Sequence, residues 1–453
     1  MSTTLDQLAT DLDGTLTRPG DAGWDTARQA WNLAVDQRPA AVVLAGSVRD
    51  VQATVLAATA LGLRVAPQST GHNAPPLGDL GGTILLKTSA LRAVQIDPQA
   101  RVARAEAGAM WMDVTPLAAK HGLAALAGSA PDVGVAGYTL GGGLSWLGRA
   151  HGLAANSVVA LEVVTADGRL RRVDAAHDPD LFWALRGGGG SFAVVTALEF
   201  RLLPISEVYA GVLFFPIERA EEVLQAWREW VTTVPQSITS IGRLLKFPPL
   251  PELPPFLSGQ SYVVVEATCL LDAPAADAVL APLRALGPAI DTFRPTPVEE
   301  LSQLHMDPPG PVPGHGDGLM LAELTPAAVT AFARFAAPDV PLLSVELRHL
   351  GGALTPGQVS AGAVDGINGG FAMFAVGITP TPDSYAAVHG AVVAAQHALA
   401  PWASGGMYLN FAESRKSGDA LFGSGTYRRL QQVKAAYDPA DVIRANHPVP
   451  PAA

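Results

Sequence analysis

The sequence is poor in the residues that several classes of protein require. Its 453 residues include one cysteine, Cys269, so no intrachain disulfide can form and a cysteine-rich zinc site is excluded by count. We expect Cys269 to be a small buried hydrophobe. Charged residues make up only 16% of the chain, and the net charge is −11. No run of lysine and arginine interrupts this acidic balance, which disfavours a nucleic-acid or anionic-membrane partner.

Long apolar segments are also missing. No stretch reaches about 18 uninterrupted apolar residues, so no membrane-spanning helix and no membrane partner are expected. The segment Met1–Gly14 has no basic stretch followed by an apolar one, and so does not resemble a classical signal peptide. We expect a cytoplasmic protein. The sequence leaves the oligomeric state open.

Apolar residues are plentiful, at 49%, and 46 glycines and 37 prolines are spread along the chain. Residues 1–204 alternate short apolar runs with helical patterns, which indicates an α/β unit. The predicted strands there are Ala41–Ala45, Arg64–Pro67, Thr83–Leu86, Val158–Val164 and Phe192–Leu203, and the predicted helices are Arg49–Leu61 and Trp111–His121.

Residues 205–404 differ from the first region in their pattern of predicted strands and helices, and residues 405–453 resemble the first region again. The predicted strands of the middle region are Val208–Phe215, Ser261–Leu271, Leu342–Leu350 and Phe371–Ile378, and its predicted helices are Glu218–Val231 and Ser384–Ala400. A further helix, Gly425–Tyr437, is predicted in the tail. Two proline-rich loops, Phe247–Phe256 and Asp307–Gly314, either border a binding site or are plain solvated connectors.

Two patterns suggest chemistry that their context does not support. Asp11 and Asp13 match the aspartate motif of haloacid-dehalogenase-type phosphatases, but no apolar strand precedes them. His305, His315 and Asp317 could form a metal cluster, but we expect them in a proline- and glycine-rich loop without helical spacing. No metal site is predicted.

Three glycine-rich segments point to a ligand. Gln68–Asn73 follows a predicted strand, and its small residues suit a nest of backbone N–H groups for a pyrophosphate. Five glycines lie between Gly134 and Gly143, and four more form Gly187–Gly190 before an apolar strand. The three-glycine fingerprint of dinucleotide-binding Rossmann folds is not completed. From the residues alone, a turn with a surface histidine remains the simpler interpretation of His72.

The order of these segments resembles that of the vanillyl-alcohol-oxidase, or PCMH-type, FAD-binding superfamily, in its berberine bridge enzyme-like branch. The resemblance covers nearly the whole chain. The matching segments are Pro19–Asp21, Ala30–Asn32, Gln68–Asn73, Gly134–Arg149, Gly152–Asn156, Val163–Gly168, Asp180–Gly190, Tyr408–Phe411, Tyr427–Leu430, Tyr437–Val442 and Asn446.

This resemblance implies an α+β fold. A PCMH-type FAD-binding domain of two subdomains is expected over residues 1–204, and a substrate domain with an antiparallel sheet covered by helices over residues 205–404. Residues 405–453, the berberine bridge enzyme-like C-terminus, are expected to return to the FAD domain.

The resemblance also implies one covalent link, from His72 to the flavin. Family members with a second, cysteinyl link carry it at the position of Ala130, so we expect no second link. Val133 matches a position near the flavin that governs access of oxygen, and valine there resembles the oxidases. The implied cofactor-binding residues are His72, Gln68, Ser69, Thr70, Gly71, Asn73, Val133, Gly134, Gly137, Gly141, Gly142, Gly143, Leu144, Asn156, Val164, Asn410 and Asn446. Gln68 and Thr70 differ from the arginine and glycine that the family often has.

Tyr408 matches the tyrosine that serves as the base in several members, although an aromatic residue packed in a strand is the plain alternative. A phenol has a pKa of about 10, so such a base needs nearby positive charge or hydrogen bonds. Glu346, Arg348 and His349 are substrate candidates, with strand alternation placing His349 on the opposite face; a surface ion pair explains Glu346 and Arg348 equally well.

The implied reaction is oxidation of an alcohol or a related group of a small organic molecule, a sugar or a secondary metabolite, with O₂ giving H₂O₂. Two alternatives stay open. A flavin dehydrogenase would use another electron acceptor, and slow reoxidation by O₂ would reveal it. A protein of this fold that binds flavin without turnover would release no peroxide with any alcohol.

Overall fold

The computed structural model describes residues 4–308, 310–358 and 362–452. Three residues of the Met1–Gly14 segment, and Pro309 of the second proline-rich loop, lie outside the described residues. The fold is mixed α+β, as predicted, and contains three sheets of four, five and eight strands. No helix in the described part of the chain has both the length and the apolarity to cross a bilayer.

The four-stranded sheet has a parallel core that leads to the site. Its order is β1 (Thr15–Thr17), β2 (Ala41–Leu44), β4 (Thr83–Lys87) and β3 (Arg64–Gln68), with only β1 antiparallel. Helix α3 (Val48–Leu61) packs on it, capped by Ser47 and ended by Gly62. Two short helices, α1 (Leu5–Asp11) and α2 (Trp24–Ala27), lie before β2. Asp11 ends α1, and β1 follows rather than precedes it, so the phosphatase motif lacks its strand.

The five-stranded sheet is antiparallel. It is formed by β5 (Val94–Asp97), β6 (Val102–Glu106), β9 (Val194–Arg201), β7 (Val158–Val164) and β8 (Leu170–Asp174). Its core includes Trp111 of α4 (Trp111–Ala119) and Leu185 of α8 (Pro179–Leu185). Three short helices lie between α4 and β7 in the chain, in and after the glycine-rich segment: α5 (Val135–Leu140), α6 (Gly148–His151) and α7 (Ala154–Ser157).

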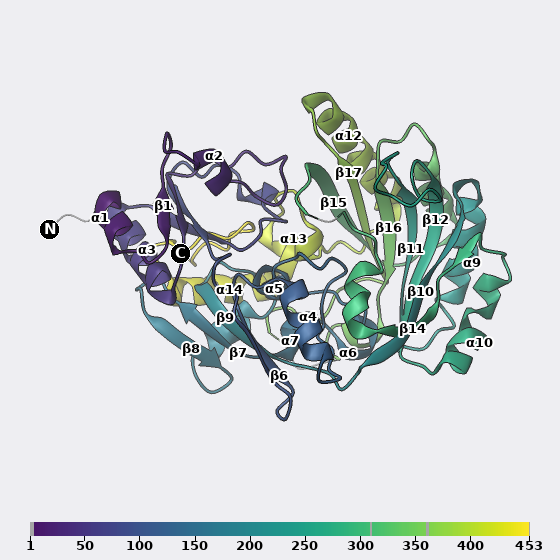
Figure 1. Cartoon of the computed structure of the whole chain (residues 1–453), viewed down its shortest axis with the longest axis horizontal. Helices are drawn as coiled ribbons and strands as arrows, with labels where there is room; N and C mark the ends of the chain where they lie inside the picture. Colours follow the sequence, from purple (N-terminus) through teal and green to yellow (C-terminus); the bar gives the residue numbers. More distant parts are fainter. Residues whose placement is uncertain (1–3, 309, 359–361, 453) are drawn as a thin grey trace.

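The eight-stranded sheet is antiparallel and covered by helices, as predicted (Figure 1). Its strands are β10 (Glu207–Pro216), β11 (Ile238–Lys246), β12 (Ser261–Cys269), β13 (Ile290–Asp291), β14 (Arg294–Pro297), β15 (Gly314–Leu321), β16 (Ser344–His349) and β17 (Phe371–Ile378). The covering helices are α9 (Ala220–Trp230), α10 (Ala273–Arg284), α11 (Pro326–Ala333) and α12 (Pro382–Leu399). Cys269 is buried in the core beneath them, which confirms the expectation for it.

Strand β15 corrects one prediction. His315 and Asp317 lie in this strand, not in a loop. The glycines that suggested a loop allow close packing instead, because a Cβ on Gly316 would lie 2.7 Å from the Phe374 ring and one on Gly318 would lie 2.9 Å from Phe411 Cβ. Alternate glycines therefore mark contact with a neighbouring element.

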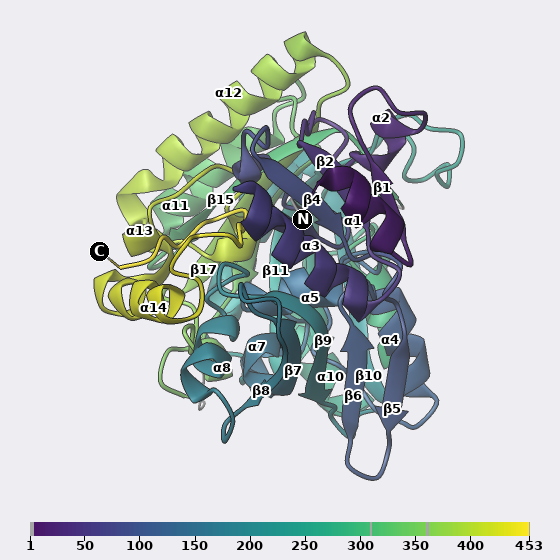
Figure 2. The same cartoon turned by 90° about the vertical axis from the view of Figure 1, so that its left-hand side faces the viewer.

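The tail returns to the first two sheets through α13 (Gly418–Phe422) and α14 (Ser424–Tyr437), and α14 lies beside α8 (Figure 2). Lys434 of α14 has no exposed surface. Its Nζ donates to the backbone oxygens of Ser191 and Ile443, each at 2.7 Å, and to Asp438 Oδ2 at 2.5 Å. The Asp438 carboxylate also accepts from the backbone N–H groups of Val442 and Ile443. This buried ion pair joins the tail to the segment before β9.

Replacing Lys434 by methionine should therefore destabilise the protein strongly, because the Asp438 carboxylate would stay buried without a cation. We expect the free energy of unfolding in urea to fall by about 3–5 kcal/mol. The control is Arg64→Met, which removes a half-exposed partner of Asp441 and should change that free energy by less than about 1 kcal/mol. Similar losses in the two variants would contradict this role of Lys434.

Candidate active site

A cavity of about 1250 Å³ lies where the three sheets and the tail meet. Of the predicted site residues, its walls include Gln68, Ser69, Thr70, Gly71, His72, Asn73, Ala130, Val133, Gly134, Gly137, Gly141, Leu144, Arg348, Tyr408, Asn410 and Asn446. Segments more than 300 residues apart in sequence thus line the same cavity. Gly142, Gly143, Asn156, Val164, Glu346 and His349 do not line it.

His72 stands at the wall of this cavity. Gly71 before it has φ +87°, a turn conformation that glycine adopts readily. Its imidazole stacks on the Trp31 ring at 4.0 Å, and Nδ1 lies 2.8 Å from Thr70 Oγ1. Nε2 lies 3.4 Å from Asp132 Oδ1, and Trp31 Nε1 donates to Asp132 Oδ2 at 2.6 Å. His72 does lie in a turn, but because three side chains hold its ring and only 21% of the side chain is exposed, it is not a free surface histidine.

Trp31 and Asp132 are the residues at this wall that sequence reasoning missed as functional, although both lie in or beside segments that carried the resemblance. Burial acts to raise the pKa of Asp132, but the His72 ring and the Trp31 indole outweigh it, so the pKa lies below its usual value. Asp132 is therefore a carboxylate beside His72 at neutral pH.

Gln68 lies in a different environment. Its side chain, 6% exposed, accepts from Lys87 Nζ at 2.5 Å and donates to Gln37 Oε1 at 2.8 Å. Burial lowers the pKa of Lys87 to about 8, and its other hydrogen bond goes to the backbone oxygen of Gln29. Gln68 thus lines the cavity with its side chain held by Lys87 and Gln37.

Tyr408 is 4% exposed and lies opposite the glycine-rich segment. Asn410 Nδ2 donates to Tyr408 Oη at 3.1 Å and to the Tyr138 backbone oxygen at 2.9 Å. The backbone N–H groups of Gly143 and Leu144 also hydrogen-bond to the phenol oxygen. Burial raises the pKa of Tyr408, and these hydrogen bonds and the Arg348 charge lower it only in part.

Glycine is required at positions 141 and 142 because the side chains of Asn410 and Tyr408 lie directly against the backbone there. A Cβ on Gly141 would lie 1.8 Å from Asn410 Oδ1, and one on Gly142, at φ +115°, would lie 3.3 Å from the Tyr408 ring. The tail also reaches the His72 side of the cavity, because Asn446 Nδ2 donates to the Asn73 backbone oxygen at 3.2 Å. The tail therefore forms part of two walls.

A dinucleotide cofactor fits the polar groups of this cavity. Among the described residues, Ser69 Oγ and Asn73 Oδ1 are buried atoms without a hydrogen bond, and both residues line the cavity. Buried polar atoms usually have partners, so their presence indicates a polar ligand. A Cβ on Gly137 would meet nothing within 4 Å, which leaves room along the same wall. The amide of Asn156 is also unpartnered, although it lies off the cavity.

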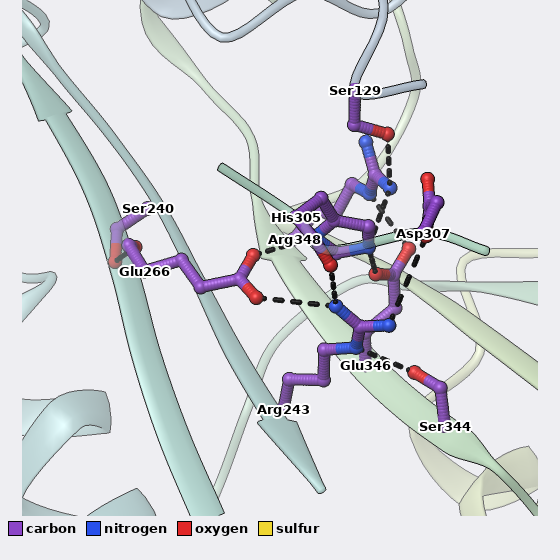
Figure 3. Close-up of polar contacts among 9 residues, drawn as sticks. All are labelled: Ser129, Ser240, Arg243, Glu266, His305, Asp307, Ser344, Glu346 and Arg348. Carbon is purple, nitrogen blue, oxygen red and sulfur yellow. Dashed lines mark hydrogen bonds and ion pairs between the residues drawn. The ribbon is translucent and has the colours of Figure 1, made fainter. Parts of the chain in front are cut away.

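A cluster of buried charged side chains borders the cavity on the side of the eight-stranded sheet (Figure 3). His305 Nδ1 lies 2.5 Å from Glu266 Oε2, and its Nε2 forms an ion pair with Glu346 Oε2 at 2.8 Å. Glu346 Oε1 accepts from Arg348 Nε at 2.7 Å. Arg243 Nη1 lies 3.2 Å from Glu266 Oε1. With Glu346 2% exposed, the interpretation as a surface ion pair is wrong.

The cluster holds His305 as an imidazolium. Burial and Arg243 act to lower the pKa of His305, but Glu266, Asp307 and Glu346 outweigh them and raise it to about 9. Burial acts to raise the pKa of Glu346, yet Arg348 and His305 hold it well below its usual value. The two carboxylates are therefore bridged by a cation.

The other predicted residues lie elsewhere. His349 points to the opposite face, as the alternation predicts, and stacks on Phe371 at 5.6 Å. Burial lowers the pKa of His349 to about 3. His315 pairs with His389, and Asp317 pairs with Lys416, so these two do not join His305. No group of three metal-ligating side chains occurs within the described ranges.

Comparison with known proteins agrees with this geometry. A family model described as FAD binding domain matches residues 39–174, and one described as berberine and berberine like matches residues 407–450. The chain thus contains one segment similar to an FAD binding domain and one similar to the berberine and berberine like family. The two matches contain the His72 segment and the Tyr408 segment, respectively.

Curated relatives match part of the chain. A xylooligosaccharide oxidase of Thermothelomyces thermophilus is 29% identical over 234 residues, which are 50% of this chain and 47% of that protein. An (R)-6-hydroxynicotine oxidase of Paenarthrobacter nicotinovorans is 35% identical over 198 residues, 43% of each chain. The chain thus spans about half the length of the curated relatives it matches. The solved structure of BBE-like 1 of Physcomitrella patens has a TM-score of 0.85 over 100% of both chains, at 22% identity, which shows the shared fold.

Filling the space beside Gly137 should prevent cofactor binding without unfolding the protein. We expect Gly137→Leu to lower the flavin bound per chain at least tenfold, whereas the cofactor-free protein keeps its melting temperature, because leucine suits a helix. The control is Gly390→Leu in α12, where a Cβ also meets nothing within 4 Å but the position is exposed and away from the cavity. Unchanged flavin content in Gly137→Leu would contradict the fit.

Proposed function

We propose that this protein is an FAD-dependent oxidase with one covalent link to its flavin, through His72. It oxidises the CH–OH group of a small organic molecule. The observation that carries the proposal is that His72 and Tyr408, 336 residues apart, line one cavity whose glycine-rich wall has unpartnered polar atoms. The two curated relatives are oxidases by name, which favours an oxidase over a dehydrogenase.

The residues of this chain would hold FAD from two sides. Ser69, Asn73 and Asn446 would face its polar groups, and Ala130 offers no thiol for a second link. Trp31, Thr70 and Asp132 hold the His72 ring in one orientation at the cavity wall, where it would meet the cofactor. When bound, FAD would supply two-electron redox chemistry, by which the alcohol would be oxidised to a carbonyl and O₂ reduced to H₂O₂.

Tyr408 Oη is the group placed to take the hydroxyl proton of the substrate. Asn410 Nδ2 and the N–H groups of Gly143 and Leu144 all direct hydrogens at this oxygen. Such donors stabilise the phenolate that the proton transfer needs.

Covalent attachment is tested by denaturing the purified protein in acid and separating precipitate from supernatant. We expect the flavin to stay with the precipitated wild-type chain and to appear in the supernatant for His72→Ala. The control, His177→Ala, removes an exposed histidine and should retain the link. Complete release from the wild type would exclude a covalent link, and retention in His72→Ala would assign it to another residue.

Removal of the phenol oxygen should abolish turnover and spare cofactor binding. For Tyr408→Phe we expect kcat, followed as peroxide release from an alcohol that the wild type oxidises, to fall by a factor on the order of 10² to 10⁴, with flavin content unchanged. Because burial raises the pKa of Tyr408, the wild-type rate should increase with pH as the phenolate fraction grows, and this increase should vanish in the variant. Tyr427→Phe in α14 is the control, and equal rates for wild type and Tyr408→Phe would refute the role.

A further inference from the structure

Arg348 has hydrogen-bonding capacity that its protein neighbours do not use. Its side chain is 13% exposed, lines the cavity, and lies over the Phe411 ring at 5.1 Å. Within the described part of the chain, its hydrogen bonds and ion pairs involve Nε and Nη2 only, so Nη1 has no partner. The Nη2 contacts are long, at 3.4 Å to Ser129 Oγ and 3.4 Å to His305 Nε2.

The second of these contacts is not a hydrogen bond at neutral pH. With a pKa of about 9, His305 is protonated, and its Nε2 hydrogen belongs to the ion pair with Glu346. A protonated Nε2 cannot accept from Arg348. Both outer nitrogens of the guanidinium therefore lack a strong acceptor, and a buried charged donor without one is costly.

The buried cluster holds Arg348 in this position. Arg348 Nε is bound to Glu346, Glu346 to His305, and His305 to Glu266, whose other oxygen is bound to Arg243 (Figure 3). Asp307, with its side chain 29% exposed, lies 3.9 Å from Arg243 Nη2. Because each link is buried, the outer edge of the Arg348 guanidinium is presented in one orientation. A planar pair of donors of this kind matches the two oxygens of a carboxylate.

The remaining wall on the side of the eight-stranded sheet is largely apolar. Leu250 and Leu253 come from the first proline-rich loop, and Phe374, Val376 and Ile378 come from β17. The other cations there are already engaged: Arg243 donates to Ser344 Oγ and to the His305 backbone oxygen and pairs with Glu266, and Lys246 donates to the backbone oxygens of Ala337 and Val340. An apolar wall with one available guanidinium suits a carbon skeleton with one acid group, and it offers few partners for the many hydroxyls of a sugar chain.

We infer that the substrate is an apolar hydroxy acid, an aromatic or alicyclic alcohol whose carboxylate is bound by the Arg348 guanidinium. Ser129 at 3.4 Å from Nη2 is placed to share this group. The acid would anchor one end of the molecule, and the apolar wall would direct its alcohol towards Tyr408. Oxidation of that alcohol rests on the proposed function. Binding of the acid group does not, and it can be measured without turnover.

The test uses flavin-loaded protein and two pairs of probes: 4-(hydroxymethyl)benzoate and 6-(hydroxymethyl)-2-naphthoate, each against its methyl ester. Binding is followed anaerobically as a perturbation of the flavin absorption spectrum, and peroxide is measured separately in air. We expect at least one acid to bind about tenfold or more tightly than its ester. In Arg348→Gln this ratio should fall to about one, chiefly through weaker binding of the acid.

Arg348→Gln removes one of the two cations that bind the buried Glu346 carboxylate, so a second variant guards against misfolding. Arg348→Lys keeps the positive charge but not the planar pair of donors, and should reduce the ratio several-fold with flavin content unchanged. Lys246→Gln, the matched control at the same wall, should keep the full ratio. Equal binding of acid and ester by the wild type in both ring systems would overturn the inference, as would a ratio that survives Arg348→Gln or disappears in Lys246→Gln. Tighter binding of the acid without any peroxide would uphold it and instead contradict the proposed oxidase.

Discussion

The ammonium group of Lys434 is the point on which the arrangement of this protein depends. It is fully buried among the Asp438 carboxylate and the backbone oxygens of Ser191 and Ile443. These partners belong to the end of α14, to the segment before β9, and to the final stretch of the chain. A buried ammonium demands this shell of oxygens because its desolvation is expensive. The pair therefore determines where the tail returns, and with it where Tyr408 and Asn446 lie.

The site is formed by close contact between that tail and the glycine-rich segment. Gly141 and Gly142 leave room for Asn410 and Tyr408, and the backbone N–H groups that follow donate to the phenol oxygen. The same tail then crosses to the His72 side through Asn446. A shift of the tail would therefore alter both the His72 wall and the Tyr408 wall of the cavity.

Charge is distributed unevenly around this cavity. On the side of the four- and five-stranded sheets, the groups that line the cavity are glycine backbone, small hydroxyls and amides, which suit a polar cofactor. On the side of the eight-stranded sheet, most of the charge lies in a cluster in which an imidazolium bridges two carboxylates between two arginines. A chain of buried ion pairs contributes little net stability, but it presents Arg348 in a single orientation at an otherwise apolar wall.

Local patterns in the sequence predicted much of this molecule. Strands and helices such as Val158–Val164 and α14 follow from apolar periodicity, and the order of the glycine segments indicated the FAD-binding family. Strands β11 and β15 were missed, because β15 has glycine at every second position of its first half and resembles a loop. Neither periodicity nor motif order could show that Glu266, His305 and Glu346 meet, since they belong to different elements and are adjacent only across the folded sheet. The sequence by itself determined the resemblance to FAD-binding proteins and the candidate flavin residues His72 and Tyr408. Only the tertiary structure decided that Asp132 holds His72, that Glu346 is buried and that Arg348 faces the cavity, because burial and ion pairing arise between segments that only folding brings together.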